Sequence, residues 1–229
     1  MKKLTFLLLC VAMAACGGPA RQPEAQPAQE IPTTLSMKGE TIKLTTPTST
    51  ATLLDALKER KSVRSYDDSP LTIDQLSGVL WAAAGQTRPD GKLTAPSAMA
   101  LYPIKVYAVI ETGIYLYNSA KHELTLVKAG DYRKLTGLQD FVSLAALNIM
   151  YIADLSVYEG KGVPELNMLL MCAMDAMGYC ENANLWAAGN GMDAITRAGA
   201  HGEEFLAEIG APASYRFMLA QSVGTVLMK

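Results

Sequence analysis

A short stretch early in the chain, RKSVRSY beginning at Arg60, carries residue types that bind phosphate. In an extended backbone the side chains of Arg60, Ser62 and Arg64 lie on one side, because successive side chains point to opposite faces. Arginine offers paired N–H donors that match the oxygens of a phosphate group. A second interpretation fits the same residues, namely a solvated basic turn whose arginines pair with Asp67 and Asp68. Both interpretations stand at this point.

The histidine, cysteine and serine residues that could act in catalysis lie far from one another in the sequence. The two histidines, His122 and His201, are far apart and have no cysteine or acidic cluster near them, so no metal site is predicted. Cys180 and Ser97 have no histidine nearby in the sequence, which argues against a hydrolase. The chain has no Gly-x-Gly-x-x-Gly stretch after a strand and no P-loop, so neither a Rossmann site nor a nucleoside triphosphatase is indicated.

The composition indicates one globular domain with appended segments. Half of the 229 residues are hydrophobic and 18% are charged, which is enough to bury a full core. The net charge is −2, and no long basic tract is present. We therefore predict that the protein has no nucleic-acid partner.

The N-terminal residues predict export and a lipid anchor. Residues 1–15 combine two lysines with the apolar run Leu4–Val11, which is typical of a signal peptide and too short to span a membrane stably. The ending AMAAC resembles the lipobox of bacterial lipoproteins, which implies that Cys16 is lipidated and anchors the protein on the periplasmic or cell-surface side. The alternative is an ordinary cleaved signal followed by an incidental cysteine. Residues 16–48 are predicted to be a flexible tether, and residues 49–229 the folded domain.

Local patterns predict a mixture of helices and strands. Two capping boxes, Thr52 with Asp55 and Thr72 with Gln75, each begin a helix. The segment GIYLYNSAKHELTLV predicts a hairpin, and hence antiparallel pairing. Because the elements show no regular βαβ alternation, the predicted fold class is α+β. The expected helices cover residues 52–60, 72–85, 131–136, 164–188 and 203–210, and the expected strands cover 104–110, 113–127 (as the hairpin), 147–155 and 216–224.

The long helix expected at 164–188 is rich in sulfur. Its methionines at 168, 171, 174 and 177 recur every third residue and so wrap around a helix. A helix that is apolar on most sides is buried, in the core or at a subunit interface; core packing is preferred here over a metal-binding methionine box. Cys172 and Cys180 lie about 12 Å apart along such a helix, beyond the reach of a disulfide, and are predicted to be buried thiols.

Three further segments follow RKSVRSY in order: TAPSAMALYP at 94–103, GMDAITRAG at 191–199 and FMLAQSVG at 217–224. Together the four segments resemble the nitroreductase superfamily of FMN enzymes, over about residues 50–229. The ALYP ending of the second segment resembles the branch of thiazole/oxazole-forming dehydrogenases. The resemblance implies a nitroreductase-like fold, with a central, mostly antiparallel sheet flanked by helices. It also implies a homodimer with the flavin at the interface.

The resemblance implies roles for the basic residues. Arg60 and Ser62 would contact the FMN phosphate, and Arg64 would lie near the ribityl chain and the N1–C2=O edge of the flavin. A cation there stabilises the charge that collects on N1 when the flavin is reduced. Many relatives supply a further basic pair after the last strand; here either Lys229 takes that place, or the phosphate site has fewer contacts and binds FMN more weakly. The pair at 181–182 stands where close relatives have Gln-Asn and is interpreted as structural.

Two other segments are implied at the flavin ring. Ser97, Ala98 and Ala100 match the loop along its pyrimidine edge, with Ala100 standing where many relatives have asparagine, so that one hydrogen bond to the ring is missing. Arg197 and Ala198 match a dipeptide at a strand end whose backbone amide approaches flavin N5, and Ala198 is the preferred donor.

These expectations converge on an FMN-dependent oxidoreductase that takes electrons from NAD(P)H or another carrier. The acceptor would be a small organic molecule. One alternative is an exported lipoprotein that keeps this scaffold but only binds a ligand or partner. Another is azoline oxidation on a modified peptide, which requires a maturation partner.

Overall fold

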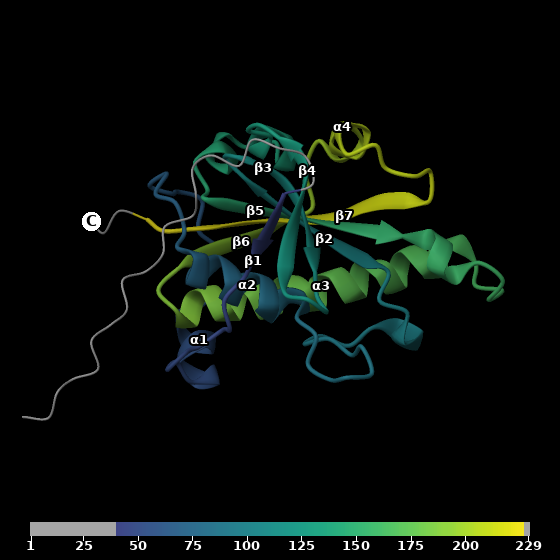
Figure 1. The fold of residues 1–229 in the computed structure, drawn as a ribbon, viewed down its shortest axis with the longest axis horizontal. Coiled ribbons are helices and arrows are strands. Elements are labelled where there is room, and N and C mark those ends of the chain that lie inside the picture. Colours follow the sequence, from purple (N-terminus) through teal and green to yellow (C-terminus); the bar gives the residue numbers. More distant parts are fainter. Residues whose placement is uncertain (1–39, 227–229) are drawn as a thin grey trace, which may run out of the picture.

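The computed structural model describes residues 40–226 (Figure 1). The predicted signal peptide, Cys16 and Lys229 lie outside the described residues, and the expectations for them stay predictions. Within residues 40–226, no helix combines the length and the apolar character needed to cross a membrane.

One seven-stranded sheet forms the centre of the fold, in the order β1-β4-β3-β2-β5-β7-β6. Every pair of neighbouring strands is antiparallel, which confirms the predicted α+β class. Strand β5 lies between β2 and β7 and is buried along nearly all of its length, as its run of apolar residues predicts. The strands are β1 (Thr41–Lys43), β2 (Ile104–Ile110), β3 (Gly113–Asn118), β4 (Glu123–Ala129), β5 (Leu147–Asp154), β6 (Asp193–Arg197) and β7 (Tyr215–Gly224).

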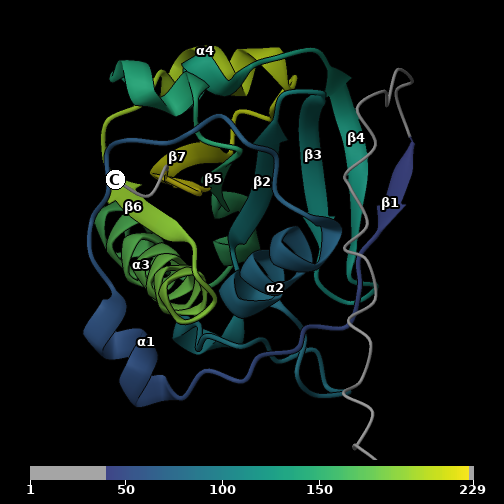
Figure 2. The same cartoon turned by 90° about the vertical axis from the view of Figure 1, so that its left-hand side faces the viewer.

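Helical elements cover both faces of the sheet (Figure 2). Helices α2 and α3 pack on one face, and α4 lies on the other with two short 3₁₀ turns. Both predicted capping boxes are present at the starts of α1 and α2. The helix expected at 131–136 is a 3₁₀ turn instead. The α-helices are α1 (Leu53–Glu59), α2 (Ile73–Ala84), α3 (Glu165–Gly189) and α4 (Gly202–Glu208), and the 3₁₀ turns are Ala98–Ala100, Arg133–Thr136, Asp140–Ser143 and Leu155–Tyr158.

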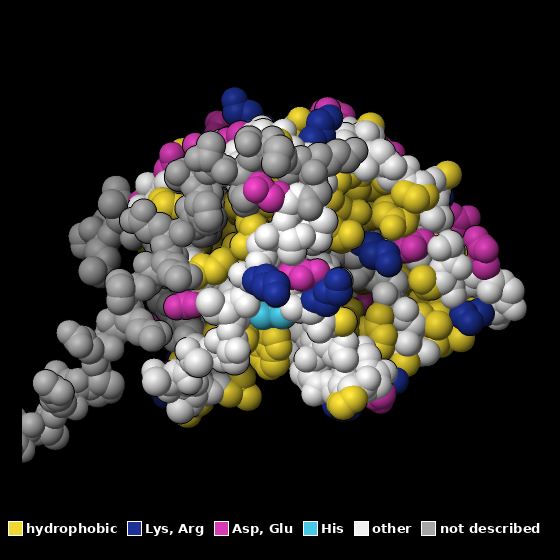
Figure 3. Space-filling model, viewed as in Figure 1, with side chains coloured by type: hydrophobic (Ala, Val, Ile, Leu, Met, Phe, Trp, Pro, Cys, Tyr) yellow, Lys and Arg dark blue, Asp and Glu magenta, His cyan; other side chains and the backbone are white. Residues whose placement is uncertain are grey.

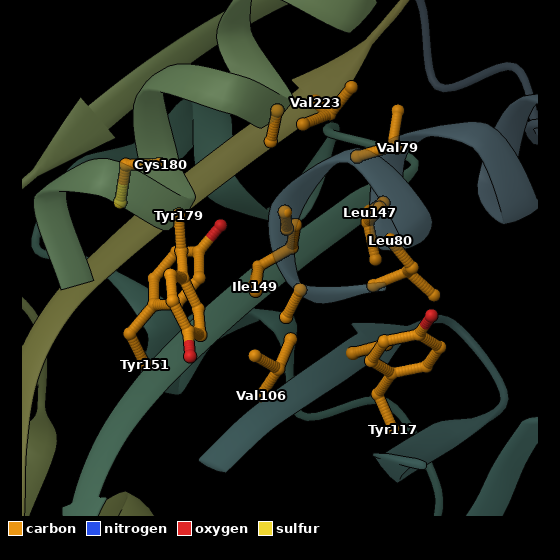
Figure 4. Packing of buried hydrophobic residues seen from close by; sticks show 14 of the residues in the cluster. Val79, Leu80, Val106, Tyr117, Leu147, Ile149, Tyr151, Tyr179, Cys180 and Val223 are labelled. Carbon is orange, nitrogen blue, oxygen red and sulfur yellow. The ribbon is translucent and has the colours of Figure 1, made fainter. Parts of the chain in front are cut away.

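The larger hydrophobic cluster fills the space between the sheet and helices α2 and α3 (Figure 4). Tyr151 of β5 and Tyr179 of α3 meet edge to face, with ring centroids 6.4 Å apart. Cys180 of α3 is buried in the same cluster, and so is Cys172. Both are free thiols, which confirms the prediction for the two cysteines.

The prediction that the methionines of α3 pack in the core is right for only two of them. Met168 and Met171 pack against the core, whereas Met174 is 64% exposed and Met177 is 43% exposed. The reason is geometric, because only one side of α3 faces the sheet and its other side is open in the single chain.

The surface carries charges of both signs. On the face shown in Figure 3, the side chains of lysine, arginine, aspartate and glutamate are interspersed among the described residues. Such a mixture gives that face no dominant sign with which to attract an oppositely charged macromolecule.

The predicted tether, residues 16–48, extends too far toward the domain. Residues 41–43 form the edge strand β1 and pair with β4. The segment continues along the domain, where the backbone N–H of Thr45 donates to Ser77 Oγ of α2 at 2.9 Å. A strand of three residues is too short to show an alternating pattern, so its place is set by β4 and not by its own sequence.

His122 fastens this N-terminal segment to the hairpin of β3 and β4. Its Nε2 lies 2.9 Å from the carbonyl oxygen of Thr45, which can only accept, so Nε2 carries the proton. Its Nδ1 lies 2.8 Å from the hydroxyl of Tyr117 and accepts from it in the neutral imidazole. Burial lowers the pKa of His122, while the bond to Thr45 acts in the opposite direction. The folded state therefore holds this histidine neutral.

We predict that acid weakens the fold through His122. Because the pKa of His122 is lower in the folded protein than in the unfolded chain, the unfolded chain binds the proton first, and stability falls as the pH drops below about 6.5. His122→Asn removes this titration and keeps a residue that tolerates the observed φ of 50°. Urea unfolding at pH 7.5 and pH 5 measures the change. The native protein should lose more stability between the two pH values than the variant; equal losses would contradict the prediction.

Candidate functional site

The segment that holds Arg60, Ser62 and Arg64 lies along the outer edge of β6. Helix α1 ends at Arg60, whose backbone turns to an extended conformation. Ser62 then forms a parallel bridge with Ala194 of β6, and the N–H of Val63 donates to the Ala194 carbonyl at 3.2 Å. The chain is therefore extended at this segment, as its alternating pattern predicts, and the sheet edge fixes where its side chains lie.

Tyr66 locks the far end of this segment into the fold. Its ring is buried, and its hydroxyl lies 3.2 Å from the Val63 carbonyl and 3.3 Å from the Ser222 carbonyl. A Cβ on Gly224 would lie 2.8 Å from the tyrosine ring, so the glycine leaves the room that the ring occupies. Burial raises the pKa of Tyr66, which keeps the phenol a neutral donor.

The structure does not pair these arginines with Asp67 and Asp68, as the basic-turn interpretation requires. The side chain of Asp67 accepts from the Ser69 N–H at 3.0 Å and from the Thr225 hydroxyl at 2.9 Å. Asp68 forms its ion pair with Arg133, at 3.2 Å. Both aspartates thus have other partners, and the pairing that the basic-turn interpretation predicted is wrong.

The acidic groups near the segment are loosely placed. Arg60 Nε lies 4.0 Å from Glu181 Oε1, and Lys61 Nζ lies 3.9 Å from Asp193 Oδ1. Arg64 is exposed and makes no ion pair with any residue in the range 40–226. The segment therefore presents positive charge that the described protein neutralises only weakly.

A chain of hydrogen bonds that runs out from the core positions Glu181. Its carboxylate accepts from Asn184 Nδ2 at 3.0 Å, and Asn184 Oδ1 accepts from Gln221 Nε2 at 2.7 Å. Gln221 in turn accepts from the hydroxyl of Tyr151 at 2.6 Å. The structural role expected for residue 181 agrees with this geometry, since the network joins α3 to β7 and β5.

Arg197, at the end of β6, is buried. Its Nη2 donates to Asn148 Oδ1 at 3.1 Å and to Ser222 Oγ at 2.9 Å, and its Nη1 donates to the carbonyl of Thr136. A Cβ on Gly137 would lie 2.1 Å from Nη1, so only glycine leaves room for the guanidinium. Burial lowers the pKa of Arg197 to about 10, and the group therefore keeps its charge at neutral pH.

The sequence analysis assigned a role only to the backbone amide at residues 197–198. It did not predict that the Arg197 side chain would be buried and hydrogen-bonded inside the protein. Ala198, the predicted N5 donor, follows β6 directly and is exposed. Arg197 holds the strand end from inside the molecule. Its Nε is buried and has no hydrogen-bond partner within residues 40–226. The Arg197 side chain thus anchors the end of β6, while Ala198 next to it is exposed.

The loop of residues 97–100 is anchored to α3 by Asp175, which no sequence pattern pointed to. Ser97 Oγ donates to Asp175 Oδ2 at 2.5 Å, and the Ala98 N–H donates to Asp175 Oδ1 at 3.1 Å. The Ser97 hydroxyl also accepts from the Tyr102 N–H at 2.9 Å. The polar atom of Ser97 thus shapes the loop. Ala98 is half-buried, and Ala100 is exposed.

This loop stores backbone strain. Met99, Ala100 and Tyr102 have φ values of 55°, 54° and 50°, in the left-handed region that residues with a Cβ disfavour. Each such conformation costs about 1–3 kcal/mol, so the contacts with Asp175 have to offset it. The loop is held in one shape by α3, with Ala100 and Met99 on its exposed side.

The loop of residues 97–100 and the segment of residues 60–64 contact different sides of α3. Asp175 and Glu181 are six residues apart in the helix, which is about 9 Å along its axis and about 120° around it. In the part of the chain that is described, no hydrogen bond or ion pair joins residues 60–64 to residues 97–100. The two segments are therefore held by separate contacts on α3.

We predict that the buried guanidinium of Arg197 is a main source of stability. Arg197→Met would leave the buried acceptors of Asn148 and Thr136 without their donor, at a cost of roughly 3 kcal/mol in the free energy of unfolding. Arg88→Met, at an exposed arginine, is the control and should change stability by less than about 0.5 kcal/mol. Similar losses in the two variants would refute the prediction.

A second prediction concerns the loop anchor. Ser97→Ala removes a hydrogen bond to a carboxylate, so we expect stability to fall by about 1.5–3 kcal/mol. Amide hydrogen exchange at Ala98 and Tyr102 should accelerate, because their N–H groups depend on the same anchor. Ser156→Ala, at an exposed serine hydrogen-bonded to a carboxylate only two residues away, is the matched control. Unchanged exchange at both loop amides would show that Asp175 does not hold the loop.

Within residues 40–226, no group of three or more histidine, cysteine, aspartate or glutamate side chains is placed to hold a metal ion.

The candidate site consists of three parts. They are the extended segment with two guanidiniums and a hydroxyl, the end of β6 that Arg197 anchors, and the strained loop of residues 97–100.

The chain is similar to known proteins in sequence and in fold. A protein of Methanocaldococcus jannaschii that carries a provisional nitroreductase name is 34% identical over 130 residues, which are 51% of this chain and 66% of that protein. A solved structure of a provisionally named nitroreductase from Ralstonia eutropha JMP134 is 30% identical and superposes with a TM-score of 0.78, covering 90% of this chain and 97% of that one.

A more distant structure shows the same fold. The NAD(P)H:FMN oxidoreductase of Staphylococcus epidermidis, itself provisionally named, is 15% identical and has a TM-score of 0.59, covering 81% of this chain and 92% of that one. The model of the family described as "Nitroreductase family" matches residues 57–225, which include the 60–66 segment, the 97–100 loop and the end of β6. The chain belongs to the nitroreductase family.

Proposed function

We propose that this protein is an FMN-dependent oxidoreductase. The observation that carries the proposal is the extended segment on the edge of β6, where Arg60, Ser62 and Arg64 present two guanidiniums and a hydroxyl. Membership of the nitroreductase family supports it, as does the name of the fold neighbour from Staphylococcus epidermidis. Bound FMN would supply hydride acceptance and release, while the protein binds and orients it.

The donors of this segment suit a phosphate group. A phosphate accepts hydrogen bonds from a hydroxyl and from paired guanidinium N–H groups, and charge-assisted bonds of this kind are the stronger ones. The contact of Arg60 with Glu181 is loose and half-exposed, and a pair of that kind is worth about 0–1 kcal/mol. A phosphate dianion can therefore displace it. Arg64 needs no such exchange, since it makes no ion pair with the described residues.

The strand end and the loop would meet the flavin ring. The exposed backbone at Ala198 suits the role of donor toward N5, and the buried Arg197 keeps that backbone in place. Ala98 and Ala100 offer no side-chain hydrogen bond, so the loop would act through its backbone and its shape. Ser97 would contribute by holding the loop to Asp175.

We also propose a homodimer, in which the loop of one subunit meets the 60–64 segment of its partner. Two helices leave large apolar side chains exposed, and exposed apolar patches mark interaction surfaces. Along α3 they are spaced by four, four and three residues, which forms one stripe on a helix. The residues are Leu53, Leu54 and Leu57 of α1, and Leu166, Leu170, Met174 and Met177 of α3.

We also propose a cellular location, an electron donor and an acceptor, from the N-terminal residues and from the family. Cys16 would carry a lipid anchor, and the domain would work outside the cytoplasm. Electrons would come from NAD(P)H or another reduced carrier and pass to a small organic acceptor. The Ala100–Pro103 sequence ALYP favours one further acceptor, an azoline ring on a modified peptide.

The visible spectrum of the purified protein tests the cofactor. With FMN in excess followed by desalting, we expect a flavin band that dithionite bleaches. Bleaching by NAD(P)H would identify the nicotinamide donor, and bleaching by dithionite alone would point to another carrier. A protein that retains no flavin would refute the enzyme proposal and favour a lipoprotein that only binds a ligand or partner.

Variants of the segment test which residues hold the phosphate. Arg60→Ala or Arg64→Ala should each weaken FMN binding about tenfold or more, since each removes charge-assisted hydrogen bonds worth about 1.5–3 kcal/mol. Lys61→Ala is the matched control, because it removes a cation from the other side of the same segment and should change the Kd less than about threefold. If all three variants bind FMN like the native protein, the segment is not the phosphate site.

A further inference from the structure

Leu138 is an exposed apolar residue between the 3₁₀ turns Arg133–Thr136 and Asp140–Ser143, and its side chain is 63% exposed. It lies outside α1 and α3, whose exposed apolar side chains we propose to be covered in the dimer. Leu138 contacts the chain just after β6, since a Cβ on Gly199 would lie 3.3 Å from Leu138 Cδ1. Gly199 follows Ala198, the residue that we propose as the donor to flavin N5. The exposed leucine therefore lies beside the backbone that would meet the flavin ring.

Hydrogen bonds on both sides of Leu138 fix its backbone. Before it, the carbonyl of Thr136 accepts from Arg197 Nη1. After it, the carbonyl of Val142 accepts from Asn148 Nδ2 at 2.8 Å. Arg197 Nη2 also donates to Asn148 Oδ1, at 3.1 Å. One network of hydrogen bonds thus holds both the segment around Leu138 and the end of β6.

The surface of this segment is mostly apolar. Leu144 is 45% exposed, and Phe141 is half-buried with its ring centroid 5.9 Å from Arg197 Cζ. Arg197 is itself buried, and the single charged residue of 135–144 is the exposed Asp140, which is negative. An anionic group placed here loses its hydration without gaining a partner, whereas an apolar group gains by leaving water. The segment therefore suits a ligand without negative charge.

We infer that Leu138 is a specificity-determining residue for the electron acceptor. Its side chain borders the N5 edge of the bound flavin, so the site takes uncharged, apolar acceptors in preference to anionic ones. The inference rests on the proposed function, because it places N5 at Ala198.

The midpoint potential of bound FMN in Leu138→Lys and Leu138→Glu tests where Leu138 lies. A cation beside the flavin stabilises its reduced, anionic form and an anion destabilises it, so the potential should rise in the first variant and fall in the second. Ala120→Lys and Ala120→Glu are the matched controls and should keep the native potential. Ala120 is exposed in the turn after β3, which lies four strand positions from β6 in the sheet.

The outcomes separate this inference from the proposed function. Bound FMN with the native potential in both Leu138 variants would overturn the inference and leave the proposed function intact. A native protein that binds no FMN would refute the proposed function and this inference with it. Because the Leu138 side chain is mostly exposed, both variants should fold and unfold in urea at the native midpoint.

Two acceptors that differ by one charge test the specificity. They are 1,4-naphthoquinone and 1,4-naphthoquinone-2-sulfonate, each mixed in the absence of oxygen with protein reduced by one equivalent of dithionite. The quinone takes a hydride from the reduced flavin and a proton from water, which gives the hydroquinone and oxidised FMN. The measured quantity is the ratio of the two rates of flavin reoxidation, uncharged over anionic quinone. Comparing this ratio between variants cancels the different reactivities of the two quinones.

We expect Leu138→Lys to lower the ratio about fivefold, because the added cation attracts the sulfonate. Leu138→Met keeps an apolar side chain and should leave the ratio within about twofold of the native value. An equal ratio in Leu138→Lys and the native protein would refute the role of Leu138 in acceptor choice.

Discussion

The arrangement of the candidate site depends on one buried charge. The guanidinium of Arg197 joins the end of β6 to Asn148 of β5, Ser222 of β7 and the 3₁₀ turn at Thr136. Because β6 is an edge strand of the sheet and β7 is its only strand partner, these bonds tie its end to the interior of the domain. The 60–66 segment in turn takes its position from β6. The side chains that we propose to bind phosphate therefore depend for their position on an interaction inside the protein.

Helix α3 is the second element on which the site depends. One of its sides is packed in the core, while Asp175 anchors the strained loop and Glu181 lies beside Arg60. The two anchors point in different directions, so one helix supports two separate parts of the proposed flavin site. The homodimer that we propose would cover the apolar residues that α3 leaves exposed in the single chain.

Features that depend on neighbours in sequence could be predicted. The two capping boxes, the hairpin and the buried strand β5 follow from patterns a few residues long. The partners of charged side chains could not, because they depend on contacts between distant residues: Ser97 and Asp175 are 78 positions apart. For the same reason Asp68 reaches Arg133 and not the neighbouring arginines, and the three-residue strand β1 gave no signal of its own. The resemblance to a family indicated which segments to consider as the candidate site, and the structure shows which contacts hold each segment in the fold.

We propose that the edge segment beside β6 holds the phosphate of a flavin. A crystal structure of the protein grown with FMN tests it most directly. We expect the phosphate to contact the side chains of Arg60, Ser62 and Arg64, with Tyr66 and Arg197 in the buried positions described above. A phosphate bound elsewhere on the protein, or a protein that binds no flavin at saturating FMN, would contradict it.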